Sequence, residues 1–235
     1  MSDSEEFSQE DTSAHGDTTS TDVEYPETSY EALQGDTTST SDDALEEEAL
    51  IRFQHLESGL CQGDELKTNV SNICKPALKN GKTFIYVIWK SLLFRLLSKP
   101  ENEVYLATPF LDSKRLTDIC DMVLIHSDVA NIKRFYVRNK CYGSKRIREV
   151  MDVAKTNFPK RYHKTLEREV YDKIVSPSKF FHAKFIGCVN RKRDKALVLL
   201  TSANFTNHHF EKDNWDSVVY HSMTSTEFES RFSLD

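Results

Sequence analysis

The chain has 235 residues, of which 38% are hydrophobic and 29% are charged, with a formal net charge of −6 and a mean hydropathy of −0.55. This composition is lean for a chain that is folded throughout, and it suits a folded domain diluted by a polar segment. The five cysteines are odd in number and include no CxxC pair, which argues against a disulfide framework or a zinc site and favours a reducing compartment.

The polar segment is the N-terminal part of the chain. Residues 1–50 carry 16 Asp or Glu and no Lys or Arg, and the hexapeptide GDTTST occurs in them twice. Such a segment buries too little apolar surface to offset its conformational entropy. We therefore expect a disordered acidic tail over 1–50, a linker over 51–64 and one folded domain over 65–235. The N-terminus lacks the basic and apolar regions of a secretory signal, so we expect an intracellular protein, cytoplasmic or nuclear.

The acidic tail conceals a basic domain. Residues 51–235 hold all 31 Lys or Arg but only 21 of the 37 Asp or Glu, which leaves them a net charge of +10. This balance favours a protein that handles phosphates, nucleic acid or an anionic membrane surface, with an ordinary basic domain as the alternative. We hypothesise that the tail folds back over the basic face and competes with an anionic substrate.

Helices are expected first, at 70–78 and 84–97. The second coincides with the most apolar window, TFIYVIWKSLLFRLL, which is short for a membrane span and is interrupted by Lys90 and Arg95. Its apolar residues fit a helix covered on most sides, with the two charges on the exposed remainder. We expect a core helix and no transmembrane segment, with an interfacial amphipathic helix as the alternative.

Strands and helices then alternate along the chain. Apolar patterns predict strands at 104–108, 132–137 and 169–175, and the helices between them begin at Asp112 or Ser113 and at Ser144. Residues 180–189 and 196–204 are expected to form a hairpin around the polar loop 190–195, followed by a strand at 215–220 and a helix at 224–232. This order predicts an α/β (α+β) sandwich, with a mixed β-sheet flanked by helices.

Four polar residues in the hairpin are the candidates for chemistry. His182 and Lys184 are two apart on the first strand, so their side chains are expected on one face, and Ser202 and Asn204 have the same relation on the second. Pairing of the strands would bring all four to one end of the hairpin. An imidazole can act as a nucleophile or general acid, while Lys, Ser and Asn can hold phosphate oxygens. We interpret these residues as a phosphodiester-cleaving site.

These motifs resemble those of the phospholipase D superfamily. The family has His-x-Lys followed by a strand that ends in Gly-Ser-x-Asn, and this chain has HAK at 182–184 and TSANF at 201–205. Its Asn-Trp-Asp at 214–216 is similar to the Asn-x-Glu of single-motif nucleases, and VYLATPFLDSKRL at 104–116 looks like the family's first strand and helix. The chain departs from the family at Val189, where an Asp is usual, and at Thr201, where a Gly is usual.

The resemblance implies a phospholipase D-like domain and a metal-independent phosphodiesterase, in the first place a nuclease, without a cofactor. Its reaction would pass through a covalent phosphohistidine on His182. Because the chain has one His-x-Lys motif, the resemblance implies a homodimer in which both copies contribute His182, Lys184 and Asn204 to a shared site. Asp216 would orient a His182 imidazole. The alternatives are a phospholipid (cardiolipin-type) hydrolase with the same mechanism and a phospholipase D-like scaffold or binding protein without activity.

Other conspicuous residues have simpler interpretations. His208 and His209 are read as exposed loop residues. Trp215 is read as part of the core, with a base-stacking platform as the alternative. The basic run at 191–195 is read as a solvated turn. If the tip of the hairpin borders the active site, Lys192, Arg193 and Lys195 are the residues expected to grip a polynucleotide backbone.

Overall fold

The computed structural model describes residues 54, 56–57, 59–139 and 146–234. The predicted acidic tail at 1–50, and Ser144 as the start of a helix, lie outside the described residues. The main elements are, in chain order, α2 (Gly63–Ser71), β1 (Ala77–Asn80), a π-helical turn (Gly81–Ile85), α3 (Tyr86–Leu97), β2 (Glu103–Thr108), α4 (Ser113–Ile125), β3 (Ile132–Val137), α5 (Ile147–Lys155), α6 (Lys160–Glu169), β4 (Ile174–Val175), β5 (Phe185–Asn190), β6 (Lys195–Thr201), α7 (Asn207–Phe210), β7 (Trp215–Met223) and α8 (Ser225–Phe232).

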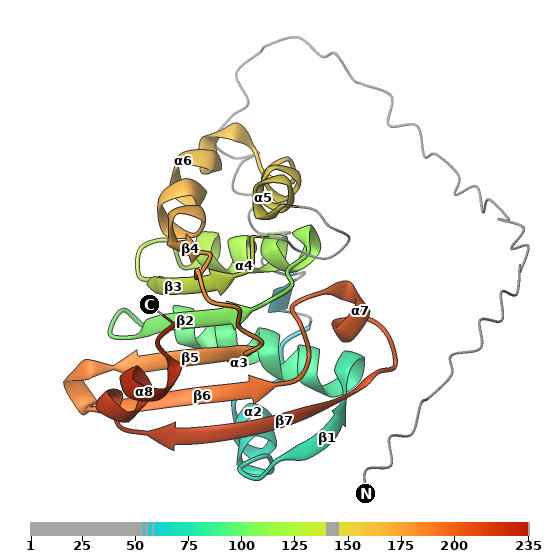
Figure 1. Ribbon diagram of the computed structural model, residues 1–235, viewed down its shortest axis with the longest axis vertical. Helices are drawn as coiled ribbons and strands as arrows, with labels where there is room; N and C mark the ends of the chain where they lie inside the picture. Colours follow the sequence, from blue (N-terminus) through green and yellow to red (C-terminus); the bar gives the residue numbers. More distant parts are fainter. Residues whose placement is uncertain (1–53, 55, 58, 140–145, 235) are drawn as a thin grey trace, which may run out of the picture. The chain divides into compact units, whose positions relative to one another are not determined.

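The strands form one mixed sheet of seven, as the order of elements predicts. Their spatial order is β1-β7-β6-β5-β2-β3-β4, and Figure 1 shows the hairpin β5–β6 near its middle. β2, β3 and β4 are parallel to one another, whereas β5, β6, β7 and β1 continue the sheet in antiparallel pairs. The predicted fold class is confirmed.

Helices cover both faces of this sheet. On one face, α3 and α4 bury Leu93 and Ile119 against strand residues such as Ile186 and Leu199. On the other face, Phe228 of α8 packs with a second cluster of strand residues, Phe185, Val189, Ala196 and Val198. Figure 1 shows α8 in front of the sheet and α3 behind it. The chain is therefore layered as helix, sheet and helix.

The core helix is confirmed, with one difference. α3 follows a π-helical turn and buries Trp89, Leu93 and Leu97 completely. Arg95 is exposed as predicted, but Lys90 is only 5% exposed. Burial lowers the pKa of Lys90, while the nearby carboxylate of Asp118 favours its charged form. No described helix is long and apolar enough to cross a membrane.

Two predicted elements are wrong. The helix expected at 70–78 is instead the end of α2, which stops at Ser71, and the strand β1, which pairs with β7. Pro76 disfavours helical backbone at the residue before it, and this breaks the helix that the apolar pattern had suggested. The strand expected at 169–175 is reduced to Ile174–Val175, because α6 continues to Glu169 and a 3₁₀ turn buries Tyr171 in the core.

The topology brings six strand ends to one edge of the sheet. Ala107 near the end of β2 lies opposite Phe185 at the start of β5, which in turn lies opposite Leu200 near the end of β6. The start of β7 lies beside the end of β6 and the end of β1. β3 ends at the same edge, because it is parallel to β2. We refer to this edge as the site edge.

Candidate active site

His182 and Lys184 lie at the site edge, immediately before β5. They belong to an extended segment rather than to the regular strand that was predicted, although the amide of Thr201 still donates to the carbonyl of Lys184 at 3.0 Å. The Nζ of Lys184 lies 2.9 Å from Nδ1 of His182 and 3.0 Å from its carbonyl oxygen. The two side chains therefore meet, as the spacing predicts. Lys184 is 4% exposed, whereas the ring of His182 reaches solvent.

The electrostatics of this pair favour a neutral imidazole. The positive charge of Lys184 lowers the pKa of His182, and burial and the charge of Arg138 act in the same direction. Burial lowers the pKa of Lys184 as well, again with help from Arg138, while the charge of Asp216 opposes the shift. A neutral imidazole has the free lone pair that a nucleophile needs.

Ser202 follows the end of β6 and holds the start of β7. Its hydroxyl donates to Oδ1 of Asp216 at 2.6 Å and accepts from the amide of Ser217 at 2.9 Å. Asp216 is 6% exposed, so its charge is largely removed from water. Ser202, after the end of β6, thus positions the carboxylate of Asp216 on the neighbouring strand β7.

Asn204 and His209 complete the polar cluster. The Nδ1 of His209 lies 3.0 Å from Oδ2 of Asp216, and its Nε2 lies 3.2 Å from the amide nitrogen of Asn204. The interpretation of both adjacent histidines as exposed loop residues is wrong for His209, which lies on the short helix α7 with a side chain 23% exposed. His208 is exposed, as expected. Thr206, a residue type common at helix N-caps, was the signal for a short helix at this point in the chain.

Asp216 does not contact His182 within the chain. Its two carboxylate oxygens are engaged by Ser202 and His209. The predicted role of Asp216, to orient a His182 imidazole, is therefore not realised by the two residues of one chain.

Arg138 is a site residue that the sequence analysis missed. It directly follows β3, and its Nε donates to the carbonyl of Phe181 at 2.9 Å. Its guanidinium lies 3.4 Å from the ring centroid of Phe180, a side chain that is 83% exposed. The only signal in the sequence was its position directly after the strand β3. That position indicates a site residue only when β3 is known to run parallel to β2, and the sequence alone does not show this.

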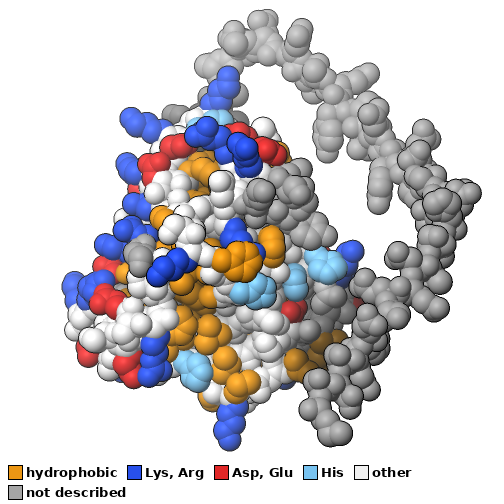
Figure 2. All heavy atoms as spheres, in the orientation of Figure 1, with side chains coloured by type: hydrophobic (Ala, Val, Ile, Leu, Met, Phe, Trp, Pro, Cys, Tyr) orange, Lys and Arg blue, Asp and Glu red, His pale blue; other side chains and the backbone are white. Residues whose placement is uncertain are grey.

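A shallow hollow of about 380 Å³ opens beside these residues. Figure 2 shows hydrophobic and histidine side chains together at the surface on this side of the molecule. The hollow is lined by Pro76, His182, Lys184, Leu200, Thr201, Ser202, Ser217, Val218 and Val219. Its lining combines apolar side chains with the imidazole of His182 and the ammonium of Lys184, so it can receive a group that bears one anionic end.

The predicted substrate-binding residues of the hairpin tip are not part of this site. Asn190 pairs with Lys195 at the end of the hairpin opposite to the pair Phe185 and Leu200. Lys192, Arg193 and Lys195 are exposed there, as a solvated turn should be. The two ends of β5 are about 15–20 Å apart at the rise of a β-strand, so these three residues do not reach the hollow of their own chain.

Two further sequence features are resolved by the fold. Val189, at the position of the family's usual Asp, is fully buried under α8 and away from the site edge, so it leaves the site's geometry untouched. Trp215 is 67% exposed, so its assignment to the core is wrong. It begins β7 beside Asp216, at the site edge.

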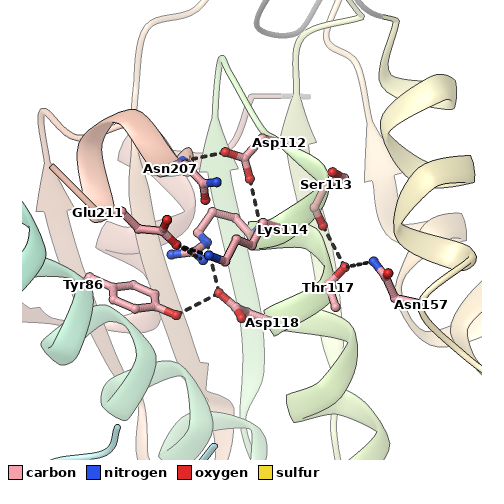
Figure 3. A network of polar contacts seen from close by, with 10 residues as sticks. Tyr86, Asp112, Ser113, Lys114, Thr117, Asp118, Asn157, Asn207 and Glu211 are labelled. Carbon is pink, nitrogen blue, oxygen red and sulfur yellow. Dashed lines mark hydrogen bonds and ion pairs between the residues drawn. The ribbon is translucent and has the colours of Figure 1, made fainter. Parts of the chain in front are cut away.

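An ion cluster around the buried Arg115 holds α7 against α4 and α3 (Figure 3). Arg115 is 1% exposed, and its guanidinium lies 3.0 Å from Asp118 and 3.0 Å from Glu211. Tyr86 donates to the same carboxylate oxygen of Asp118 at 3.0 Å. Glu211 immediately follows α7, two residues after His209, so the cluster limits the movement of the helix that carries this imidazole.

Backbone contacts fix α7 from two other sides. The side chain of Asp112 caps α4 through the amide of Arg115 at 2.9 Å, and its second oxygen accepts from the amide of Asn207 at 2.5 Å. A Cβ at Gly81 would collide with the carbonyl oxygen of His209, so glycine is needed for this close approach. The position of His209 therefore depends on three separate parts of the chain.

Among the described residues, no three His, Cys, Asp or Glu side chains are arranged to hold a metal ion. Metal independence of the reaction stays a prediction.

No protein family model matches the sequence, and no curated protein matches it. Solved structures are similar to it, among them Nuc, a phospholipase D family member from Salmonella typhimurium. That likeness has a TM-score of 0.40 and 14% identity over 66% of this chain and 89% of the other.

NucT from Helicobacter pylori is similar with a TM-score of 0.35 and 14% identity, over 65% of this chain and 87% of the other. Polyphosphate kinase from Porphyromonas gingivalis is similar with a TM-score of 0.43 and 15% identity, over 70% of this chain but 26% of the kinase.

Proposed function

We propose that this protein is a metal-independent phosphodiesterase that cleaves nucleic acid through a covalent phosphohistidine. The observation that carries the proposal is the buried Lys184 in contact with His182, beside the Ser202–Asp216 pair on one edge of the sheet. The net charge of +10 on residues 51–235 favours a polyanionic substrate over a neutral one.

The chemistry follows from the groups at the site edge. A neutral nitrogen of His182 attacks phosphorus, a P–N bond forms, and the bond from phosphorus to the leaving oxygen breaks. The ammonium of Lys184 and the amide of Asn204 hold the non-bridging oxygens, whose negative charge develops further in the transition state. Water then attacks the phosphohistidine, the P–N bond breaks, and His182 is restored.

This scheme needs a second imidazole to protonate the leaving oxygen and later to take a proton from water. The resemblance to single-motif family members implies that a second copy of the chain supplies it, as the His182 of a two-fold homodimer. Size-exclusion chromatography with light scattering measures this assembly directly. A dimer is the expected result, and a strict monomer would contradict a site shared between two copies.

The activity is tested with the full-length protein in EDTA. We expect cleavage of single-stranded or duplex nucleic acid, and we expect His182→Ala to lower its rate by about 10⁴-fold or more, because the nucleophile is lost. His221→Ala is the matched control, since His221 is an exposed histidine within β7, away from the site edge. Vesicles of cardiolipin and of phosphatidylcholine are assayed in parallel. Cleavage of lipid alone would favour the phospholipid hydrolase, and a folded protein that cleaves neither would favour the scaffold.

A further inference from the structure

The second imidazole need not come from another copy of the chain. His209 lies in the same polar cluster, with Nδ1 3.0 Å from Asp216 and Nε2 3.2 Å from the side chain of Asn204. A carboxylate on Nδ1 fixes the tautomer and orientation of an imidazole. The carboxylate is itself oriented by the hydroxyl of Ser202 at 2.6 Å.

The surroundings of Nε2 suit an exchangeable proton. Among the described residues, the buried Oδ1 of Asn204 has no hydrogen-bond partner, and the amide nitrogen of the same side chain is the atom nearest Nε2. The oxygen and nitrogen of an amide exchange places by a rotation of the side chain. One rotamer of Asn204 thus donates to neutral His209, and the other accepts from protonated His209. Asn204 accommodates both charge states of the ring.

Asn204 also connects His209 to the substrate. In the proposed function its amide holds an oxygen of the phosphodiester, and a group bound there lies beside Nε2 of His209. Ser202, which donates to Asp216, lines the same hollow as His182 and Lys184, so the two halves of the cluster meet there.

We propose that His209, oriented by Asp216, is the proton donor of the reaction and replaces a partner's His182 in that role. This inference rests on the proposed phosphodiesterase function. His182 then supplies the nucleophile and His209 the acid, so one chain holds a complete site.

The protons balance over the two steps of the reaction. In the first step His182 forms the P–N bond while the proton on Nε2 of His209 passes to the departing oxygen, and Asp216 remains a carboxylate. In the second step water attacks phosphorus and gives a proton back to Nε2 of His209 as the P–N bond breaks. Both imidazoles return to their starting states.

The test compares two leaving groups. On a polynucleotide the leaving alkoxide needs a proton, so His209→Gln should lower the rate by about 10²- to 10⁴-fold. On bis(p-nitrophenyl) phosphate the leaving phenolate is stable without protonation, so in the first turnover, which does not include hydrolysis of the phosphohistidine, the same variant should release p-nitrophenolate less than about tenfold more slowly. His182→Ala should lose both activities. His208→Gln is the matched control, because His208 is the exposed neighbour of His209 on α7.

Three results would overturn the inference. An equal loss on both substrates would make His209 a structural residue, and no loss on either would leave the acid to another group. Restored activity on mixing His182→Ala protein with His209→Gln protein would place the two imidazoles of a site on different chains. Thermal unfolding curves of His209→Gln and of a second variant, His209→Asn, show whether a protein that has lost activity is still folded. A wild-type protein that cleaves neither substrate would instead refute the proposed phosphodiesterase itself.

Discussion

At the scale of single residues, the contact between Lys184 and His182 does two things at once. In the proposed function the buried ammonium holds a phosphate oxygen, and its charge also lowers the pKa of the neighbouring imidazole. A histidine nucleophile benefits from both effects, because protonation would remove its lone pair. The same arrangement keeps Lys184 out of water, and this burial lowers the pKa of Lys184 itself.

Replacing this lysine should therefore change the titration of its neighbour. Lys184→Met should raise the pKa of His182 towards the ordinary value of 6.5, because the largest cause of its depression is removed. NMR titration of the His182 ring measures the shift. Lys179→Met, which removes an exposed lysine upstream, is the control and should leave the titration unchanged. A His182 pKa that stays in place or falls in Lys184→Met would contradict this account of the pair.

At the scale of elements, the four-residue helix α7 is too short to be stable by itself and is held by its neighbours. Arg115 on α4 reaches Glu211 after α7 and Asp118 on its own helix, and its guanidinium lies 4.4 Å from the ring centroid of Tyr86 on α3. Because Arg115 is buried, the loss of its partners would leave an uncompensated charge out of water, and this ties the position of α7 to that of α4.

Removal of that charge should be costly. Arg115→Met removes the nearest cation from the carboxylate of Asp118, while Glu211 keeps Lys114 at 2.6 Å, and we expect it to lower the free energy of unfolding by about 3 kcal/mol. Urea denaturation measures the loss. Arg168→Met is the control, since Arg168 is 71% exposed and its ion pair with Glu169 should be worth at most about 1 kcal/mol. Equal losses in the two variants would mean that the cluster adds no specific stability.

At the scale of the whole molecule, charge is divided along the chain. Residues 1–50 hold 16 acidic groups and no Lys or Arg, whereas residues 51–235 have a net charge of +10. Opposite charges on one chain compete with any external polyanion for the basic surface, and salt screens that competition.

Deletion of residues 1–50 should consequently tighten binding to nucleic acid at low salt, and the gain should shrink as salt is raised. Fluorescence anisotropy with a labelled oligonucleotide at two salt concentrations measures both effects. A full-length variant with the acidic residues of 1–50 changed to Asn and Gln should behave like the deletion, because only the charge is removed. Unchanged affinity in both proteins would end the hypothesis of a competing tail.

Local patterns in the sequence predicted the centre of this fold. The hairpin of β5 and β6, the contact of His182 with Lys184, and the following strand with Asp216 could all be inferred from apolar runs and short spacings. These features depend on residues that are close together in the chain, so they can be predicted from the sequence without knowledge of the sheet topology.

The rest was decided by tertiary structure. His209 joins the site because α7 is held by residues from α3 and α4, and Arg138 joins it because β3 ends at the same edge as β2. The basic hairpin tip is excluded because antiparallel pairing places it at the opposite edge. Each of these outcomes depends on contacts between distant segments, which sequence spacing does not encode. By itself the sequence determined one imidazole of the proposed site, and only the packing of the chain brought a second one to Asp216.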